Sequence, residues 1–438
     1  MATAAIQPKL STAERERVYR RNFRIFLADF VLFTIGFNIL GPTTVIPDFV
    51  RRLTDIEVLI GLSSQLFEIG WLLPQLFIAR QLVRVQNKKW WFVGPNIPVR
   101  TLVLILAGMV ALLGPDRPGA ILGVFFLMYA LAGIGDGLVG VPWLDLTATS
   151  LDNPRRARMF GLGTALVGVA MLGIAPLVRL ILGLDNLDFP VNYALVFALA
   201  GSLFFITVPI NLTIRELPSG GQVQETIPAM REYLPQLWRV LREDAPFRAM
   251  IIVRVLVTFF AMASPFYIGF ATDTVGMSND VAVGNLLLMQ TLGSVAGALL
   301  FSWLGDQRTV QFIRMALVFG AAQPVLALLA GEVGPASLYV AFLAAGVIQG
   351  SLFIGFLNWV VLYAAPDQRP IYTGLFNSVS AVALLLTPLV GGTIVQLWGY
   401  EEVFITALAL VLAALFVAVR YVQPVHPTLE PVPAPTTD

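Results

Sequence analysis

Five ionisable side chains lie inside long apolar runs of this sequence, and they are the first candidates for chemistry. They are Asp29, Glu68, Arg100, Asp136 and Arg254. Apolar runs of about 20 residues are long enough to cross a bilayer as helices. A charge at the bilayer centre costs about 2.5–3.5 kcal/mol on insertion scales, so each of these residues is a candidate for function.

Two of the acids, Glu68 and Asp136, are the first candidates for proton coupling, and Asp29 is the third. Glu68 lies midway between Glu57 and Arg80, and no opposite charge stands one helical turn away on its own run. A carboxyl that gains and loses a proton inside the membrane can couple transport to a proton gradient. The alternative for Glu68 is a protonated acid that bonds to a neighbouring helix.

Asp136 stands among glycines in GIGDGLVG, residues 133–140, and GVIQGSLF, residues 346–353, repeats the glycines with Gln349 in place of the acid. Both stretches contain a GxxxG pair, which lets helix backbones approach closely. Two interpretations stay open. Asp136 bonds a neighbour across a tight helix contact, or it faces a cavity in which its charge is used.

The two remaining cations suggest charge pairing or substrate contact. Asp29 and Arg254 lie at similar depths in the first and seventh runs, which predicts a pair that acts as an inner gate. The alternative is that each side chain reaches separately to the inner headgroups. Arg100 follows GPNIP, residues 94–98, which predicts a delayed helix start and an interfacial arginine. Uncharged candidates for lining a cavity are Gln65, Gln290, Gln349 and Asn377.

The missing residue types exclude several kinds of chemistry. The chain has no cysteine and one histidine, His426, near its C-terminal end. No disulfide, thiolate, Cys/His metal site or Ser-His-Asp set can therefore be built. No P-loop is present, which excludes ATP-driven transport by that motif. We expect no enzymatic activity, no cofactor and no metal, and the net charge of +1 gives no reason to expect nucleic acid.

The composition places these residues in a membrane protein. Hydrophobic residues make up 57% of the chain, charged residues 13%, and the mean hydropathy is +0.79. Soluble domains carry about 25% charged residues. Since lipid offers no partners for backbone groups, the fold is predicted to be all-α and polytopic. Twelve spans are predicted, at 23–47, 57–79, 91–113, 119–142, 159–183, 191–214, 247–271, 281–304, 310–331, 336–360, 372–397 and 402–422.

The basic residues set the expected orientation. With both termini cytoplasmic, only four of the 28 lysines and arginines fall outside, namely Arg51, Arg52, Arg117 and Arg179. The positive-inside rule therefore predicts cytoplasmic termini, in the plasma or inner membrane. The longer inner connection, 215–246, is predicted to form an amphipathic helix on the inner surface or a solvated linker helix, and the tail 423–438 is predicted to be disordered.

The sequence contains an internal repeat of a six-span unit. Gly133, Asp136 and Arg156 match Gly346, Gln349 and Arg369 at one constant offset, and further matches keep the same order across the spans. Both copies have an even number of spans, so they enter the membrane from the same side. The predicted domains are a cytoplasmic segment 1–22, a bundle 23–214, the central loop 215–246, a second bundle 247–422 and the tail 423–438.

This organisation resembles the major facilitator superfamily. Besides the parallel repeat, the family's glycine–acid–basic loop motif survives in part as SWLGDQR, residues 302–308, with Asp306 in the acid's position. The first copy, ARQLVR at 79–84, departs from it, because Gln81 replaces the acid. The resemblance implies two bundles around a central cavity that opens to each side in turn. It also implies inner-gate charge relays at Asp145, Arg156, Asp306 and Arg369, which composition alone would interpret as helix-end charges.

The prediction from these observations is a secondary active transporter that works by alternating access. We expect a small-molecule substrate, protons as the coupling ion and a monomer in the bilayer. A mostly apolar cavity with few charges favours amphipathic or drug-like compounds over sugars, and export is the expected direction. A non-transporting sensor or partner-binding protein on the same scaffold is the first alternative, and a lipid-handling enzyme is the second. The short central loop and the missing catalytic sets disfavour these two.

Overall fold

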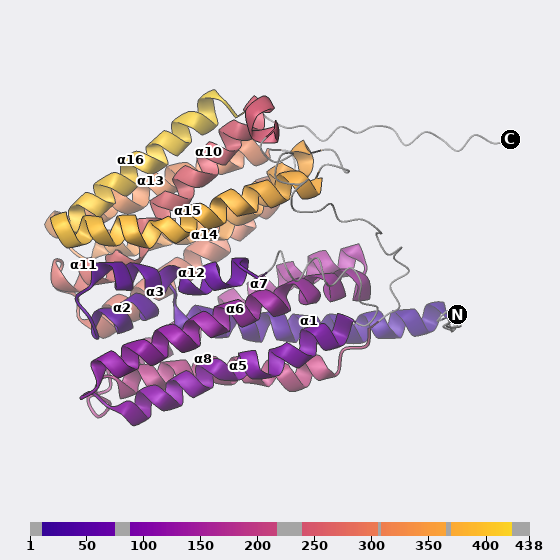
Figure 1. Cartoon of the computed structure of the whole chain (residues 1–438), viewed down its shortest axis with the longest axis horizontal. Coiled ribbons are helices and arrows are strands. Elements are labelled where there is room, and N and C mark those ends of the chain that lie inside the picture. The colour runs from indigo at the N-terminus through magenta and orange to yellow at the C-terminus, as the bar shows by residue number, and fades with distance from the viewer. Residues whose placement is uncertain (1–10, 75–87, 217–238, 305–307, 365–368, 423–438) are drawn as a thin grey trace. The chain divides into compact units, whose positions relative to one another are not determined.

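The computed structural model describes residues 11–74, 88–216, 239–304, 308–364 and 369–422. Its regular structure in these ranges is helical (Figure 1). The helices of the first half are α1 (Thr12–Leu40), α2 (Val45–Arg51), α3 (Glu57–Leu72), α5 (Lys88–Leu113), α6 (Pro118–Ser150), α7 (Asn153–Leu182) and α8 (Val191–Leu212). Those of the second half are α10 (Ala245–Phe260), η1 (Ala261–Phe266), α11 (Tyr267–Asp273), α12 (Asn279–Leu304), α13 (Thr309–Val333), α14 (Ala336–Tyr363), α15 (Arg369–Trp398) and α16 (Tyr400–Arg420).

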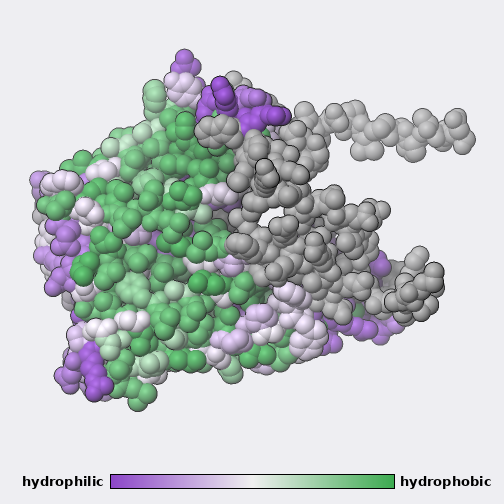
Figure 2. All heavy atoms as spheres, viewed as in Figure 1, coloured by the Kyte–Doolittle hydropathy of each residue, from purple (hydrophilic) through white to green (hydrophobic). Residues whose placement is uncertain are grey.

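The helices have the length and composition of membrane spans, as predicted. Among the described residues, 10 helical segments are long and apolar enough to cross a bilayer. Apolar side chains cover the sides of the helices in Figure 2, and hydrophilic ones gather at helix ends. Large exposed surfaces of this kind are expected only where lipid or another protein covers them. The all-α polytopic fold class is therefore confirmed, and these segments agree with twelve spans.

Two predicted spans are interrupted in the structure. The first span ends at Gly41, whose φ of 51° is left-handed, and the chain starts again as the short helix α2. Glycine is suited to this point because its lack of a Cβ makes a left-handed conformation inexpensive. The seventh span changes from α10 through a 3₁₀ turn, 261–266, to α11. Pro265 lies within that turn and cannot donate a backbone hydrogen bond, which accounts for the break.

The start of α5 also differs from the sequence-based expectation. The helix begins at Lys88 and continues through Pro95 and Pro98, so the GPNIP stretch does not delay it. The carboxylate of Glu216 accepts hydrogen bonds from the backbone N–H groups of Lys88 and Lys89, at 2.9 and 3.0 Å. Because the first N–H groups of a helix lack partners within it, this cap fixes the helix start two turns before the prolines.

The described chain falls into two compact units. Unit 1 comprises Met1–Ile227 with Ser264–Leu288, and unit 2 comprises Pro228–Ala263 with Met289–Asp438. Unit 1 therefore includes α11 and the first residues of α12, which follow the first six spans in sequence. The domain boundaries predicted from the repeat stay a prediction, and the predicted amphipathic helix and tail lie largely outside the described residues.

The same helix pairings recur in the two halves of the sequence. In unit 1, α5 packs against α6 and α8, and α1 packs against α7 and α8. In unit 2, α13 packs against α14 and α16, and α10 packs against α15 and α16. These pairs are equivalent by span order, so the repeat found in the sequence is also a repeat of packing.

The glycine stretches hold a close helix contact in each half. A Cβ on Gly133 would lie 2.7 Å from the backbone oxygen of Phe67 on α3, and one on Gly137 would lie 2.4 Å from that of Trp71. In the second half, a Cβ on Gly346 would lie 2.0 Å from the backbone oxygen of Gln290 on α12. Only glycine allows backbones to approach this closely, which confirms the packing role predicted for both GxxxG pairs.

Candidate functional site

A buried arginine on α5 is the centre of a polar cluster within unit 1. Arg100 is 6% exposed, and its Nη1 lies 3.3 Å from Oδ1 of Asp136 on α6. Its Nε donates to Oδ1 of Asn96, one turn earlier on α5, at 2.8 Å. The guanidinium carbon lies 4.0 Å from the ring centre of Phe33 on α1. The cation is thus held by a carboxylate, an amide and an aromatic face.

A second buried carboxylate belongs to the same cluster. Asp29 on α1 is 2% exposed and accepts hydrogen bonds from Nε1 of Trp143 on α6, at 2.8 Å, and from Nδ2 of Asn211 on α8, at 2.6 Å. The charge of Arg100 acts on Asp29 as well as on Asp136, and the charge of Asp29 acts on Asp136. We call Asp29, Arg100 and Asp136 the carboxylate–arginine cluster.

The cluster contains two acids and one base in a setting with little water. An uncompensated buried charge is strongly unfavourable. One guanidinium balances one carboxylate, so the second is balanced when a proton is bound to it. Two carboxyl groups that share one counterion titrate together, and their protonation belongs to the pair. The predicted proton coupling depends on this excess of one buried acid over the single buried base.

The structure separates the two interpretations of GIGDGLVG. The glycines pack α6 against α3, whereas Asp136 pairs with Arg100 on α5. Asp136 is 8% exposed, so it bonds a neighbouring helix within unit 1. Its role in coupling stays a prediction.

The other predicted polar residues of the first half lie on α3. Gln65 is buried, whereas the side chain of Glu68 is exposed. Its role in proton coupling stays a prediction.

The predicted polar residues of unit 2 are Arg254 on α10 and three amide side chains. The half-buried Arg254 donates from Nε to Oγ of Ser380 at 2.9 Å, and its guanidinium carbon lies 5.3 Å from the ring centre of Phe356. Gln290 is half-buried, while Gln349 and Asn377 are exposed. The predicted pair between Asp29 and Arg254 joins residues of different units, so it stays a prediction.

The four inner-gate candidates are only partly described. Asp145 on α6 forms an ion pair with Nζ of Lys88, at the start of α5. Arg156 is half-buried in the first turn of α7, and Arg369 is the first residue of α15. Asp306 lies outside the described residues. The roles implied by the family resemblance stay predictions for all four.

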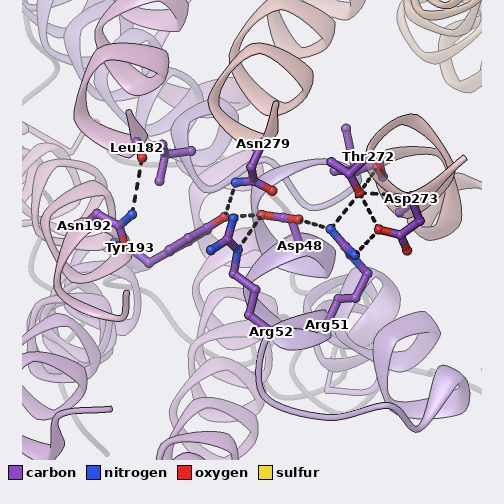
Figure 3. Close-up of polar contacts among 11 residues, drawn as sticks. Asp48, Arg51, Arg52, Leu182, Asn192, Tyr193, Thr272, Asp273 and Asn279 are labelled. Carbon is purple, nitrogen blue, oxygen red and sulfur yellow. Dashed lines mark hydrogen bonds and ion pairs between the residues drawn. The ribbon is translucent and has the colours of Figure 1, made fainter. Parts of the chain in front are cut away.

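A second polar network lies around α2 (Figure 3). Asp48 on α2 is fully buried and accepts a hydrogen bond from Nη2 of Arg51 at 3.0 Å. It also accepts one from the hydroxyl of Tyr193 on α8 and forms an ion pair with Arg52, whose Nε is 3.5 Å away. Nδ2 of Asn279, at the start of α12, donates to the Tyr193 hydroxyl at 3.0 Å. We call this set the α2 network.

Sequence reasoning missed most of the α2 network and the partners of the cluster. Arg51 and Arg52 were interpreted only as outer charges, and Asp48 was not considered. The signal was present, because Asp48, Arg51 and Arg52 have the i, i+3, i+4 spacing of one helix face. The same spacing links Asn96 to Arg100. No local pattern points to Asn211, which is far from Asp29 in sequence.

The fold and the polar site define a polytopic helical membrane protein with a buried ionisable cluster. The chain matches the model of the Major Facilitator Superfamily over residues 255–438. A comparison with curated protein sequences finds none that matches. Two solved structures show the likeness of fold. A variant of the nucleoside transporter NupG is 14% identical with a TM-score of 0.66, over 92% of this chain and 100% of that one.

The second solved structure is a bacterial homologue of the human lysosomal transporter Spinster, in an inward-facing and occupied conformation. It is 16% identical with a TM-score of 0.58, over 94% of this chain and 98% of that one. The resemblance predicted from the sequence is thereby confirmed. The second half of the chain matches the family by sequence, and the chain shares its fold with the two transporter structures.

Proposed function

We propose that the protein is a proton-coupled secondary transporter that exports a small amphipathic solute by alternating access. Secondary transport is the activity that the family match and the two transporter structures support. Proton coupling rests on one observation, the burial of two carboxylates around a single guanidinium in unit 1. We further propose a monomer in the plasma or inner membrane with cytoplasmic termini, in keeping with the distribution of basic residues.

A proton changes the balance of forces within the carboxylate–arginine cluster. When Asp136 is ionised, it holds Arg100 by a buried ion pair that links α6 to α5. When Asp136 binds a proton, this attraction weakens, and the charge of Arg100 acts mainly on Asp29 of α1. The proton thus shifts the electrostatic link from α5–α6 toward α5–α1. Transport is coupled to the proton if the α5–α6 link and the α5–α1 link favour different conformations of the protein. A ligand, here the proton, shifts a conformational equilibrium only when it binds one conformation more tightly than the other.

Polar residues of unit 2 are the proposed substrate contacts. The half-buried Arg254 on α10 and the exposed amides Gln349 and Asn377 offer charge and hydrogen bonds beside large apolar surfaces. Few charges among many apolar side chains favour an amphipathic solute. A nucleoside is the second class to test, because NupG is a nucleoside transporter.

Replacing Asp136 by Asn should abolish proton-driven flux while leaving the protein folded. The amide keeps the size of the side chain and can still accept from Arg100, but it does not bind and release a proton. Protein in liposomes would be assayed with a fluorescent amphipathic dye and with a labelled nucleoside, with and without a pH gradient. Stimulation by the gradient should fall at least about tenfold, as for the loss of an acid–base group.

The matched control is Glu332→Gln, an exposed carboxylate in the last turn of α13. It should transport like the unaltered protein. The Asp29→Asn variant should also lose the response to the gradient, because both acids share one proton. Unchanged stimulation in both aspartate variants would rule out coupling through the carboxylate–arginine cluster. Flux that ignores the gradient in the unaltered protein would rule out proton coupling itself.

A further inference from the structure

The α2 network contains two adjacent arginines that bind one buried carboxylate but differ in their other partners. The guanidinium carbon of Arg52 lies 5.7 Å from the ring centres of both Phe189 and Tyr193. Arg51 instead donates from Nη1 to Oδ1 of Asp273 at 2.8 Å and from Nη2 to Oγ1 of Thr272 at 2.9 Å. Figure 3 shows the two side chains leaving α2 in different directions on either side of Asp48.

These other partners come from different parts of the sequence. Phe189 and Tyr193 belong to the first six spans, as α2 does. Thr272 and Asp273 end α11, and Asn279 begins α12, so they belong to the seventh and eighth spans. All of them lie within unit 1. Arg52 therefore connects Asp48 to residues of the first six spans, to which Asp48 itself belongs. Arg51 and the Tyr193–Asn279 hydrogen bond connect Asp48 to residues of the seventh and eighth spans.

The two kinds of contact also differ in how easily they break. Asp48 is fully buried, so removing its counterions would leave an uncompensated charge. The Arg51–Asp273 pair is more open, with the two side chains 22% and 46% exposed. Pairs of this kind are screened by water and contribute little. Arg51 can release Asp273 without losing a counterion, because Asp48 stays beside it on the same helix.

We propose that Asp48 is a positioning residue that holds its two arginines toward different partners. Arg52 stays with Asp48 and Tyr193 throughout the transport cycle. Arg51 is held toward Asp273 and Thr272 and parts from them when the outer face opens. Asn279 then leaves Tyr193 in the same step. The inference rests on the alternating access of the proposed function, but it does not depend on proton coupling.

A single reporter cysteine tests this assignment. The chain has no cysteine, and Ala282 near the start of α12 is fully buried, so Ala282→Cys gives one hidden thiol. Protein in membranes would be treated with a membrane-impermeant maleimide from the outer side, and the labelling rate would report opening. Asp273→Asn and Arg51→Gln should each raise the rate about two- to fivefold, as for a partly exposed ion pair. Thermal stability should change little for Asp273→Asn and should fall for Arg51→Gln, which also removes a 3.0 Å hydrogen bond to buried Asp48.

Arg52→Gln is the matched control, because it removes the neighbouring arginine from the same carboxylate. It should lower the melting temperature and leave the labelling rate within about twofold. Asp48→Asn should lower the melting temperature and also raise the labelling rate about tenfold or more. The reason is that the buried carboxylate that accepts several hydrogen bonds is lost. Should Asp48→Asn fail to fold, the comparison of Arg51→Gln with Arg52→Gln still decides.

Equal labelling in the Arg51→Gln and Arg52→Gln variants would overturn the assignment. So would unchanged labelling in both Arg51→Gln and Asp273→Asn. The assay needs neither a substrate nor a proton gradient. If flux proves independent of protons while labelling follows the expected pattern, proton coupling fails and this inference stands. If coupling holds and the labelling pattern does not, only this inference fails.

Discussion

Replacing Arg100 by Met should strongly destabilise the protein. The variant leaves Asp136 and Asp29 buried without their common cation. Removing one partner of a buried ion pair costs about 3–5 kcal/mol. We expect the melting temperature in detergent to fall by roughly 10 °C, taking about 2–4 °C per kcal/mol for a large domain. Intrinsic tryptophan fluorescence during heating measures this.

The double variant Arg100→Met with Asp136→Asn distinguishes a lost charge balance from lost packing. It removes one carboxylate along with the cation, so most of the lost stability should return, while proton-driven flux should not. Arg117→Met is the control, because Arg117 is exposed at the start of α6. A double variant no more stable than Arg100→Met alone would mean that the aliphatic stem of Arg100, and not its charge, supports the bundle.

The sequence was sufficient for the fold because each span depends mainly on its own residues. Lipid requires every backbone polar group to be satisfied within the segment, so apolar length alone predicts a helix. The predicted and observed helix ends accordingly agree within a few residues for spans such as 191–214, observed as Val191–Leu212. The repeat was also visible, because glycines at equivalent places make the same close contact in both halves.

The breaks in the first and seventh spans could not be predicted from apolar content. Gly41 and Pro265 lie within runs that are apolar on both sides, and many membrane helices contain both residue types without breaking. In α5, two prolines were expected to delay the helix, and a cap from Glu216 starts it earlier. That cap joins residues more than a hundred positions apart, and no local pattern contains it.

The candidate site was predicted residue by residue, but not as an arrangement. Asp29, Arg100 and Asp136 were each identified by their charge in an apolar run. Their association depends on how α1, α5 and α6 pack, which one sequence does not specify. Arg100 was expected at the interface, whereas the structure buries it beside Asp136. The α2 network was missed because its charges lie at span ends, where a charge needs no special explanation.

Replacing Gly346 by Ala should prevent the second half of the protein from folding correctly. The added Cβ would lie 2.0 Å from the backbone oxygen of Gln290 and 2.7 Å from the backbone nitrogen of Ser294. Backbone atoms of a packed helix cannot move aside as a flexible side chain can. Overpacking a core commonly costs about 1–3 kcal/mol, and a clash between two backbones belongs at or beyond the upper end.

Folded yield, measured as the monodisperse peak in detergent, should fall at least about tenfold for Gly346→Ala and for Gly137→Ala, which belongs to the equivalent GxxxG pair on α6. Gly331→Ala and Gly161→Ala are the matched controls, because a Cβ at either position meets nothing within 4 Å. Both controls should be neutral or slightly stabilising, since alanine favours a helix more than glycine does. Equal yields for all four variants would mean that α12 and α14, and likewise α3 and α6, separate readily. In that case the GxxxG pairs of this protein would not serve to bring backbones into close contact. The position of Asp136, between the first pair of glycines, would then be set by Arg100 alone.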